Sequence, residues 1–239
     1  MWCIIKQKAQ NLNLITVNNF LDEREDIDIT SEKYSKVMFL YNSALKVINT
    51  KLEILKEELK EFYDYSPIEE ITSRIKRPES IIEKLNRKDY ALTYDNLFNH
   101  LNDVAGVRVI CNFREDVYKI VELIESFQDI RIIKKKDFIK NPKKSGYRSI
   151  HLIAEVPINF SKGLMFVKVE IQIRTLGMNF WAVLEHKLNY KNSNLSDKDK
   201  RKLIKYADMI NKIDDKMLIL SDEDKVSKMK GKTDINYIT

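Results

Sequence analysis

A short alternating stretch in the second half of the chain carries the side chains best suited to chemistry. Along residues 169–175, apolar residues alternate with polar ones: Val169, Ile171 and Ile173 against Glu170, Gln172 and Arg174. Successive side chains of a strand point to opposite faces. A strand here would bury its apolar face and present a carboxylate, an amide and a guanidinium in a row. On this pattern alone, a solvated sheet face with an ion pair is the simpler explanation, so the rest of the chain must decide.

A second carboxylate precedes another apolar run. Asp103 stands just before residues 104–111, a β-branched stretch that reads as a buried strand. With Glu170 it forms the only pair of carboxylates at the edges of apolar strands, and two carboxylates together with substrate phosphates suit Mg²⁺. Asp103 and Arg108 are an odd number of residues apart, which in a regular strand places them on opposite faces. We therefore expect a bend at Gly106 to bring both toward one site.

Two further sets of residues have the chemistry to bind a nucleotide. A basic set surrounds the turn into a helix that begins at Pro78, and cations there suit phosphates: Arg74, Lys76, Arg77, Lys84, Arg87 and Lys88. Another set follows residue 142, where Tyr147 could stack on a base: Lys143, Lys144, Gly146, Tyr147, Arg148, Ser149 and His151. Taken singly, each is equally typical of a solvated basic helix or a packed aromatic residue.

Several familiar motifs are missing from the sequence. It has no P-loop, no G-x-G-x-x-G, no Cys/His cluster for zinc and no His-Asp pair of the metal phosphohydrolase type. Any phosphate chemistry would therefore use side-chain cations and a metal held by carboxylates.

Hydrophobic periodicity predicts the elements that must position these residues. We expect a long helix over 31–63, an extended segment over 71–78, a helix from Pro78 and strands over 104–111, 130–133, 148–156 and 165–174. Further helices are expected over 115–127, over 177–190 and from a capping box at Ser196. This order predicts an α+β fold, a mixed β-sheet flanked by helices, with long N- and C-terminal helices. Residues 1–30 are expected to be a poorly ordered extension, 31–220 the domain and 221–239 a charged tail.

Composition limits the class of protein. The chain has 239 residues, 44% of them hydrophobic, and a net charge of +6 that favours a polyanionic ligand. Two cysteines are too few for a disulfide framework. No apolar run approaches the roughly 20 residues that span a bilayer, and no secretory signal is evident. We expect a cytoplasmic protein that does not bind membranes.

Taken together and in order, the motifs resemble those of the small alarmone synthetases, single-domain relatives of the RelA/SpoT enzymes. The matching stretches are residues 66–69, 74–76, 80–84, 103–109, 146–152, 169–175, 178–182 and 185–190. The resemblance covers about four-fifths of the chain, and the block from residue 169 onward is its most specific part. It implies a nucleotidyltransferase-like domain that moves the pyrophosphate of ATP onto the ribose 3′-hydroxyl of GTP or GDP. The products would be pppGpp or ppGpp, and AMP.

The resemblance also implies roles for the residues on the ATP side. Arg74 and Arg108 would sandwich adenine, and the ATP phosphates would contact Lys76, Ser80 and Lys84. Mg²⁺ would be held by Asp103, with Glu170 sharing it.

On the guanine side, the resemblance implies that Tyr147 stacks on the base. His151 and Asn179 would help to fix the nucleotide, with Lys143 near its phosphates. Glu170 would orient or deprotonate the attacking hydroxyl, supported by Gln172 and Arg174.

Assembly and regulation are expected from the same resemblance. It implies a homotetramer, synthesis without hydrolysis, and single-stranded RNA or the alarmone as candidate regulators. The segment after Pro157 lacks the Ser-Gly-Glu pattern of the alarmone-activated branch. Two alternatives stay open: an RNA-binding regulatory module on the same fold, and a related toxin that pyrophosphorylates adenine nucleotides or tRNA.

Overall fold

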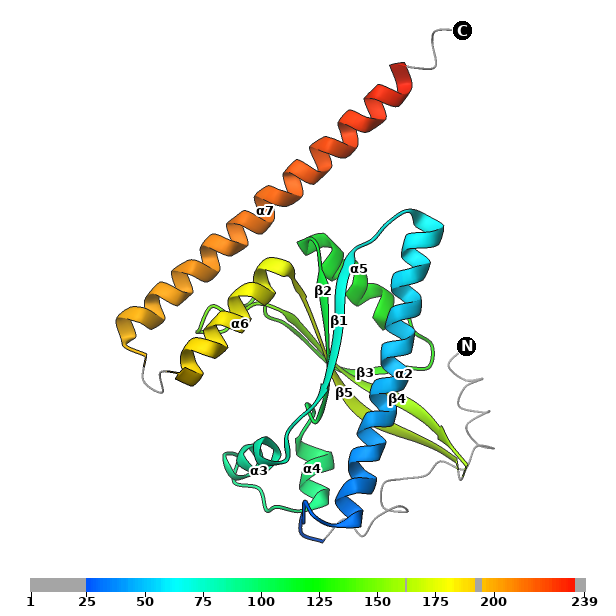
Figure 1. The fold of residues 1–239 in the computed structure, drawn as a ribbon, viewed down its shortest axis with the longest axis vertical. Helices are drawn as coiled ribbons and strands as arrows, with labels where there is room; N and C mark the ends of the chain where they lie inside the picture. Colours follow the sequence, from blue (N-terminus) through cyan, green and yellow to red (C-terminus); the bar gives the residue numbers. More distant parts are fainter. Residues whose placement is uncertain (1–24, 162, 192–194, 235–239) are drawn as a thin grey trace.

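The structure, a computed structural model, describes residues 25–161, 163–191 and 195–234 (Figure 1). In chain order the elements are α2 (Glu32–Tyr63), β1 (Ile68–Ile75), α3 (Pro78–Asn86), α4 (Tyr94–His100), β2 (Ala105–Cys111), α5 (Arg114–Glu125), β3 (Arg131–Asp137), β4 (Ile150–Phe160), β5 (Gly163–Thr175), α6 (Leu176–Lys191) and α7 (Asp197–Asp234). Among these described residues, no helix is long and apolar enough to cross a membrane.

The strands form one five-stranded sheet in the order β1-β2-β5-β4-β3. β2 and β5 are parallel, whereas the β1–β2, β5–β4 and β4–β3 pairs are antiparallel. The sheet is therefore mixed, and long helices stand at both ends of the described chain. The predicted α+β class is confirmed.

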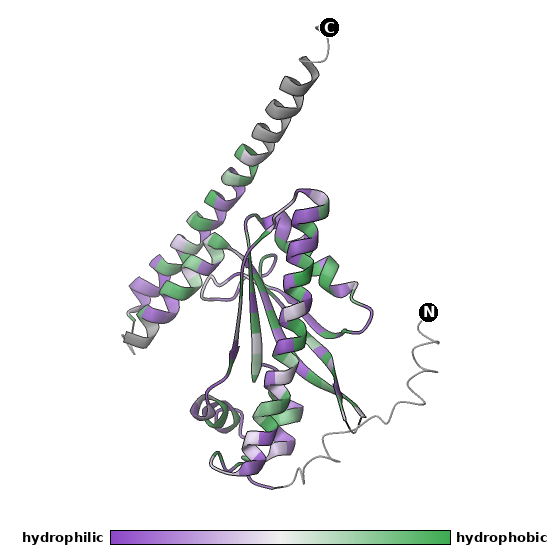
Figure 2. Cartoon of the chain, turned by 45° about the vertical axis from the view of Figure 1, so that its right-hand side comes forward, coloured by the Kyte–Doolittle hydropathy of each residue, from purple (hydrophilic) through white to green (hydrophobic). Residues whose placement is uncertain are grey.

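Helix α2 covers the apolar face of the sheet. Ser31 caps it by accepting a hydrogen bond from the Tyr34 backbone N–H at 3.1 Å. Apolar residues at helical spacing are fully buried against β1, β2, β4 and β5: Val37, Leu40, Ala44, Ile48 and Leu52. Burying each of the larger side chains contributes about 1.5–3 kcal/mol. Figure 2 shows the alternation of apolar and polar residues along this helix.

The opposite face of the sheet carries the polar side chains. On β5, Val169, Ile171 and Ile173 are fully buried beneath it. The register places Gly106 beside both Glu170 and Arg74, and Gln172 beside Arg108 on one side and His151 on the other. The predicted alternation thus places side chains from four strands on one surface.

Several boundaries differ from the expected ones. Helix α4 was not anticipated, because it has only 7 residues and too little periodicity to stand out. β3 continues through the lysines to Asp137, since antiparallel pairing with β4 holds that segment extended. β4 begins at Ile150, and the segment after Pro157 is part of the β4–β5 pairing. α7 continues beyond Leu220 into the expected tail.

The expected N-terminal extension is only partly within the described residues. Residues 1–24 lie outside them. Residues 25–30 attach to the domain: the Ile27 N–H donates to the Leu92 carbonyl at 2.7 Å, and Asp26 forms a β-bridge with Thr93. Lys33 makes an ion pair with Glu25. The start of α4 therefore provides the docking point.

Candidate active site

Glu170 is the centre of a hydrogen-bonded row on β5. One carboxylate oxygen lies 3.1 Å from His151 Nδ1, and the other accepts from Gln172 Nε2 at 2.7 Å. Arg174 donates in turn to the Gln172 carbonyl oxygen. Burial acts to raise the pKa of Glu170, but the hydrogen bonds from His151 and Gln172 outweigh it and leave the pKa lowered. The carboxylate is thus ionised and held in one orientation.

Tyr147 and His151 extend this row to one side. The Tyr147 hydroxyl lies 2.9 Å from His151 Nε2, so the imidazole bridges a phenol and the Glu170 carboxylate. The Arg174 guanidinium carbon lies 5.5 Å from the Tyr147 ring centroid, and Lys143 Nζ lies 4.7 Å from it. Burial lowers the pKa of Lys143 and of Arg174. Cations and an aromatic ring therefore lie together, an arrangement that suits a base and its phosphates.

Phe138 is a member of this cluster that the sequence did not single out. Its ring meets the His151 ring edge-on at 5.1 Å, and Lys143 Nζ lies 4.8 Å from its centroid. Phe138 follows β3 directly, and its N–H donates to the Ser149 carbonyl at 2.9 Å. A lone aromatic after a lysine run has no periodicity to mark it. Only the β3–β4 pairing reveals its place.

Asp103 lies on the other side of Glu170. Its Oδ2 accepts from Lys76 at 3.0 Å and from Lys84 at 2.6 Å. Burial acts to raise the pKa of Asp103, and the two lysines outweigh this, so the pKa is lowered. In this structure the lysines expected on ATP phosphates therefore contact a carboxylate.

The expected bend at Gly106 is wrong. Gly106 pairs regularly with Arg74 and with Glu170, and its φ is not positive. Asp103 reaches the site because it precedes β2, which begins at Ala105, so strand parity does not apply to it. A Cβ on Gly106 would approach only the Glu170 and Arg74 carbonyl oxygens, at 3.9 and 4.0 Å. The backbone conformation therefore does not require glycine at this position. The absence of a side chain at Gly106 leaves space above the sheet between Arg74 and Glu170.

A cavity that is open to solvent lies over this part of the sheet. The residues that line it come from β1, β2, β5 and the turn before β2: Thr72, Ser73, Arg74, Asp103, Gly106, Val107, Arg108, Glu170 and Gln172. Arg74 and Arg108 are on the adjacent strands β1 and β2, and Asp103 and Glu170 line the same cavity. The structure thus brings the predicted arginine pair and carboxylate pair together.

The residues present fit a divalent cation held mainly by substrate. Within the described ranges, no group of three or more His, Cys, Asp or Glu side chains could hold a metal alone. Asp103 Oδ1, however, is buried without a hydrogen-bond partner. One free carboxylate oxygen beside a cavity suits Mg²⁺, which keeps waters and binds phosphates.

Two predicted residues are not joined to this cluster by any described contact. Ser80 lies in the first turn of α3, one helical turn before Lys84. Asn179 lies in the first turn of α6, and its Oδ1 is buried without a partner. Both remain predictions.

The fold and this site together define a class of protein. Residues 73–195 match the family described as "Region found in RelA / SpoT proteins". The chain belongs to this family, and the resemblance seen in its motifs is confirmed.

Particular relatives sharpen the comparison. The chain is 40% identical over 200 residues to GTP pyrophosphokinase YwaC of Bacillus subtilis, covering 83% of this chain and 95% of the relative. Its structure is similar to that of small alarmone synthetase 1 from Bacillus subtilis bound to its product pppGpp, with a TM-score of 0.75, 35% identity, and coverage of 81% and 98%. The same enzyme bound to AMPCPP matches with a TM-score of 0.68, 32% identity, and coverage of 82% and 99%.

Proposed function

We propose that this protein synthesises (p)ppGpp by transferring the pyrophosphate of ATP to the ribose 3′-hydroxyl of GTP or GDP, releasing AMP. The observation that carries the proposal is the ionised, doubly hydrogen-bonded Glu170 at the border of a cavity between an arginine pair and a tyrosine. The relatives support it, because one is named a GTP pyrophosphokinase and others hold pppGpp or AMPCPP. We further propose that the enzyme acts in the cytoplasm.

The donor half, as we name it, consists of the four cations proposed to bind ATP: Arg74, Lys76, Lys84 and Arg108. The two guanidinium planes stack on adenine, a contact with little base specificity. Lys76 and Lys84 are held by Asp103 until nucleotide arrives and then bind its phosphates. The α-phosphate must leave as AMP, so cations that follow the phosphate chain stabilise the charge on the leaving group.

The acceptor half consists of the side chains proposed to bind GTP or GDP: Lys143, Tyr147, His151 and Arg174. Tyr147 stacks on guanine, while Lys143 and Arg174 meet the phosphates of GTP or GDP. These contacts place the ribose beside Glu170. Holding the hydroxyl in line with the β-phosphorus converts an encounter between two nucleotides into a step within one complex.

Glu170 receives the proton of the 3′-hydroxyl as the new bond forms. The oxygen bonds to the β-phosphorus, the bond between that phosphorus and the α–β bridging oxygen breaks, and AMP departs with that oxygen. His151 and Gln172 keep the carboxylate aimed at the hydroxyl. A positioned general base contributes about 10²–10⁴-fold to such a rate.

We propose Mg²⁺ as the cofactor, held by Asp103 with Glu170 alongside. When bound, it would neutralise negative charge on the ATP phosphates. Lys76 and Lys84 shift from Asp103 toward the phosphates, which leaves its carboxylate available. An Asp103→Asn variant should need more Mg²⁺ for half-maximal AMP release than the parent protein does.

We propose a homotetramer as the assembled form. Helix α7 exposes apolar side chains at helical spacing, each at least half exposed: Tyr206, Met209, Ile213, Met217 and Leu220. Such a stripe is typical of a helix that packs against another subunit. Light scattering should give four chains, and a monomer at working concentration would contradict it. Single-stranded RNA and the alarmone are the regulators to test on this assembly, because the net charge of +6 favours anionic ligands.

The experiment that tests the function is incubation of the protein with labelled ATP and GDP, followed by thin-layer chromatography. AMP and ppGpp should appear together and in equal amounts. AMP without a guanine product would contradict the proposal.

A further inference from the structure

Helix α7 contacts the domain beside the acceptor half. Its described contacts are with α5, α6, the end of β5 and the turn over residues 146–148 (Figure 1). The donor half lies instead on β1, α3 and β2. The helix is therefore placed to influence one substrate more than the other.

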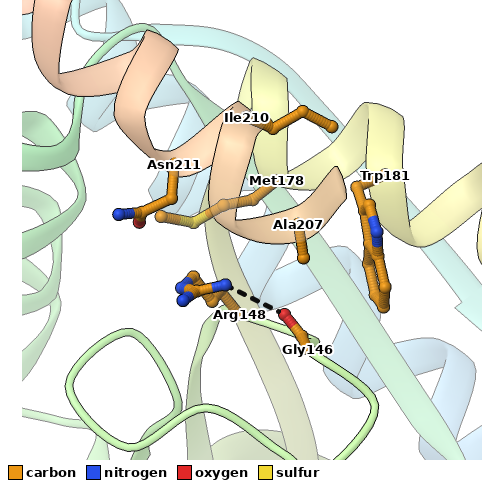
Figure 3. A pocket seen from close by; sticks show the side chains of 7 residues that line it. All are labelled: Gly146, Arg148, Met178, Trp181, Ala207, Ile210 and Asn211. Atoms are coloured by element: carbon orange, nitrogen blue, oxygen red, sulfur yellow. Dashed lines mark hydrogen bonds between the residues drawn. The ribbon is translucent and has the colours of Figure 1, made fainter. Parts of the chain in front are cut away.

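The first anchoring point is the turn that carries Tyr147. Gly146 has a φ of +93°, and a Cβ there would lie 2.9 Å from Ala207 Cβ, so α7 packs directly on this turn. Arg148 donates to the Gly146 carbonyl at 3.2 Å and to Asp208 of α7 at 2.9 Å. Figure 3 shows Arg148 closing the turn beneath α7. Tyr147 is thus fixed by both of its neighbours.

The second anchoring point is the end of β5, directly after Arg174. The Thr175 hydroxyl donates to Asp214 Oδ2 at 2.5 Å and accepts from the Met178 N–H at 3.1 Å. A Cβ on Gly177 would lie 2.4 Å from Asp214 Oδ1, so a larger residue there would displace the Asp214 side chain from this position. Asp208 and Asp214 are six residues apart, about 9 Å along the helix. One straight element therefore fixes the neighbours of both Tyr147 and Arg174.

We propose that α7 braces the acceptor half, with Asp208 and Asp214 as positioning residues that hold Tyr147 and Arg174 for the guanine nucleotide. The inference rests on the proposed function, since it names the substrate that the brace serves. It predicts an asymmetry: breaking the contacts of Asp208 or Asp214 with the acceptor half weakens binding of GDP but leaves binding of ATP unchanged.

The variant that tests the brace is Asp208→Arg, which faces Arg148 with a like charge. The matched control is Asp215→Arg on the same helix, because Asp215 pairs with Arg114 of α5 at 2.7 Å and lies outside the acceptor half. Asp208 and Asp215 are similarly exposed, at 53% and 44%. We expect Asp208→Arg to raise the KM for GDP about 5- to 10-fold, with the KM for ATP within about twofold. The control should change neither the KM for GDP nor the KM for ATP.

Rescue separates positioning from general damage. Arg148→Asp combined with Asp208→Arg restores an opposite-charge pair but loses the Arg148 bond to the Gly146 carbonyl. The KM for GDP should therefore fall below that of Asp208→Arg alone without returning fully to the parent value. Equal weakening of the binding of both substrates, or an unchanged KM for GDP in Asp208→Arg, would each overturn the proposal. Light scattering should give the same assembly for every variant.

The test is distinguishable from a test of the function itself. If the parent protein released no AMP, the proposed reaction would be refuted. Calorimetric titration with GDP and with AMPCPP would still test the proposed role of α7, because both affinities are measured without turnover. Loss of GDP affinity alone in Asp208→Arg supports it, and parallel loss of AMPCPP affinity contradicts it.

Discussion

Replacing Glu170 by Gln removes the proposed base while keeping its shape. In the protein, one Glu170 oxygen meets His151 at 3.1 Å and the other accepts from Gln172 at 2.7 Å. A glutamine has a single acceptor oxygen, so it can keep only one of these bonds to a donor. It also has no charge to take the hydroxyl proton. We expect kcat to fall about 10²–10⁴-fold, equivalent to about 2.7–5.4 kcal/mol in the barrier.

The assay is AMP release from labelled ATP with saturating GDP, alongside thermal unfolding and calorimetric titration with AMPCPP. Glu155→Gln is the matched control, because Glu155 is on β4 and pairs with Arg131 away from the cavity. The control should keep full activity. If Glu170→Gln kept kcat within about fivefold of the parent, or lost activity only by unfolding, the assignment of Glu170 as base would be refuted.

Three further predictions follow from the same geometry. Gly106→Val should raise the KM for ATP about tenfold with little change in melting temperature, since its side chain enters the cavity rather than the sheet; a large fall in melting temperature with an unchanged KM would contradict this. His151→Ala removes a hydrogen bond that lowers the pKa of Glu170. The acid limb of the kcat/KM profile should therefore move to higher pH and kcat should fall about 10–100-fold; an unmoved limb would count against the pairing. Asp103 has a pKa below its usual 3.8, so its carboxylate contributes its full stabilisation of the fold above pH 3.8. This stabilisation is lost as the pH falls through the lowered pKa of the folded state. With chelator present, the difference in unfolding free energy between the parent and Asp103→Asn should shrink as the pH falls below 3.8. A difference that does not change with pH would refute the proposed ionisation of Asp103.

Much of the fold could be predicted because periodicity reports burial directly. The apolar positions of α2 repeat at helical spacing, and its observed bounds agree closely with the expected ones. On β5, alternation alone correctly placed Glu170, Gln172 and Arg174 on one face. Helix α4 was missed because a single short turn of apolar residues looks the same in a loop. The extent of β3 depends on pairing with β4, which no local pattern records.

The site was predictable in its residue types but not in its contacts. The bend expected at Gly106 came from applying strand parity to Asp103, which lies before the strand. The bond between His151 and Glu170 requires β4 and β5 to be neighbours in antiparallel register. The anchoring of Arg148 by Asp208 joins residues 60 apart in sequence. Contacts of this kind arise from topology, so the spacing of residues along the chain cannot indicate them.

The central claim is the identity of the reaction, and product analysis tests it most directly. The protein should be incubated with ATP and Mg²⁺, and with GDP, GTP, an adenine nucleotide or tRNA as the acceptor in separate reactions. The account predicts AMP release only with the guanine nucleotides, and phosphorus NMR should place the new pyrophosphate on the 3′-oxygen. Transfer to tRNA or an adenine nucleotide instead, or no AMP release with any acceptor, would contradict it.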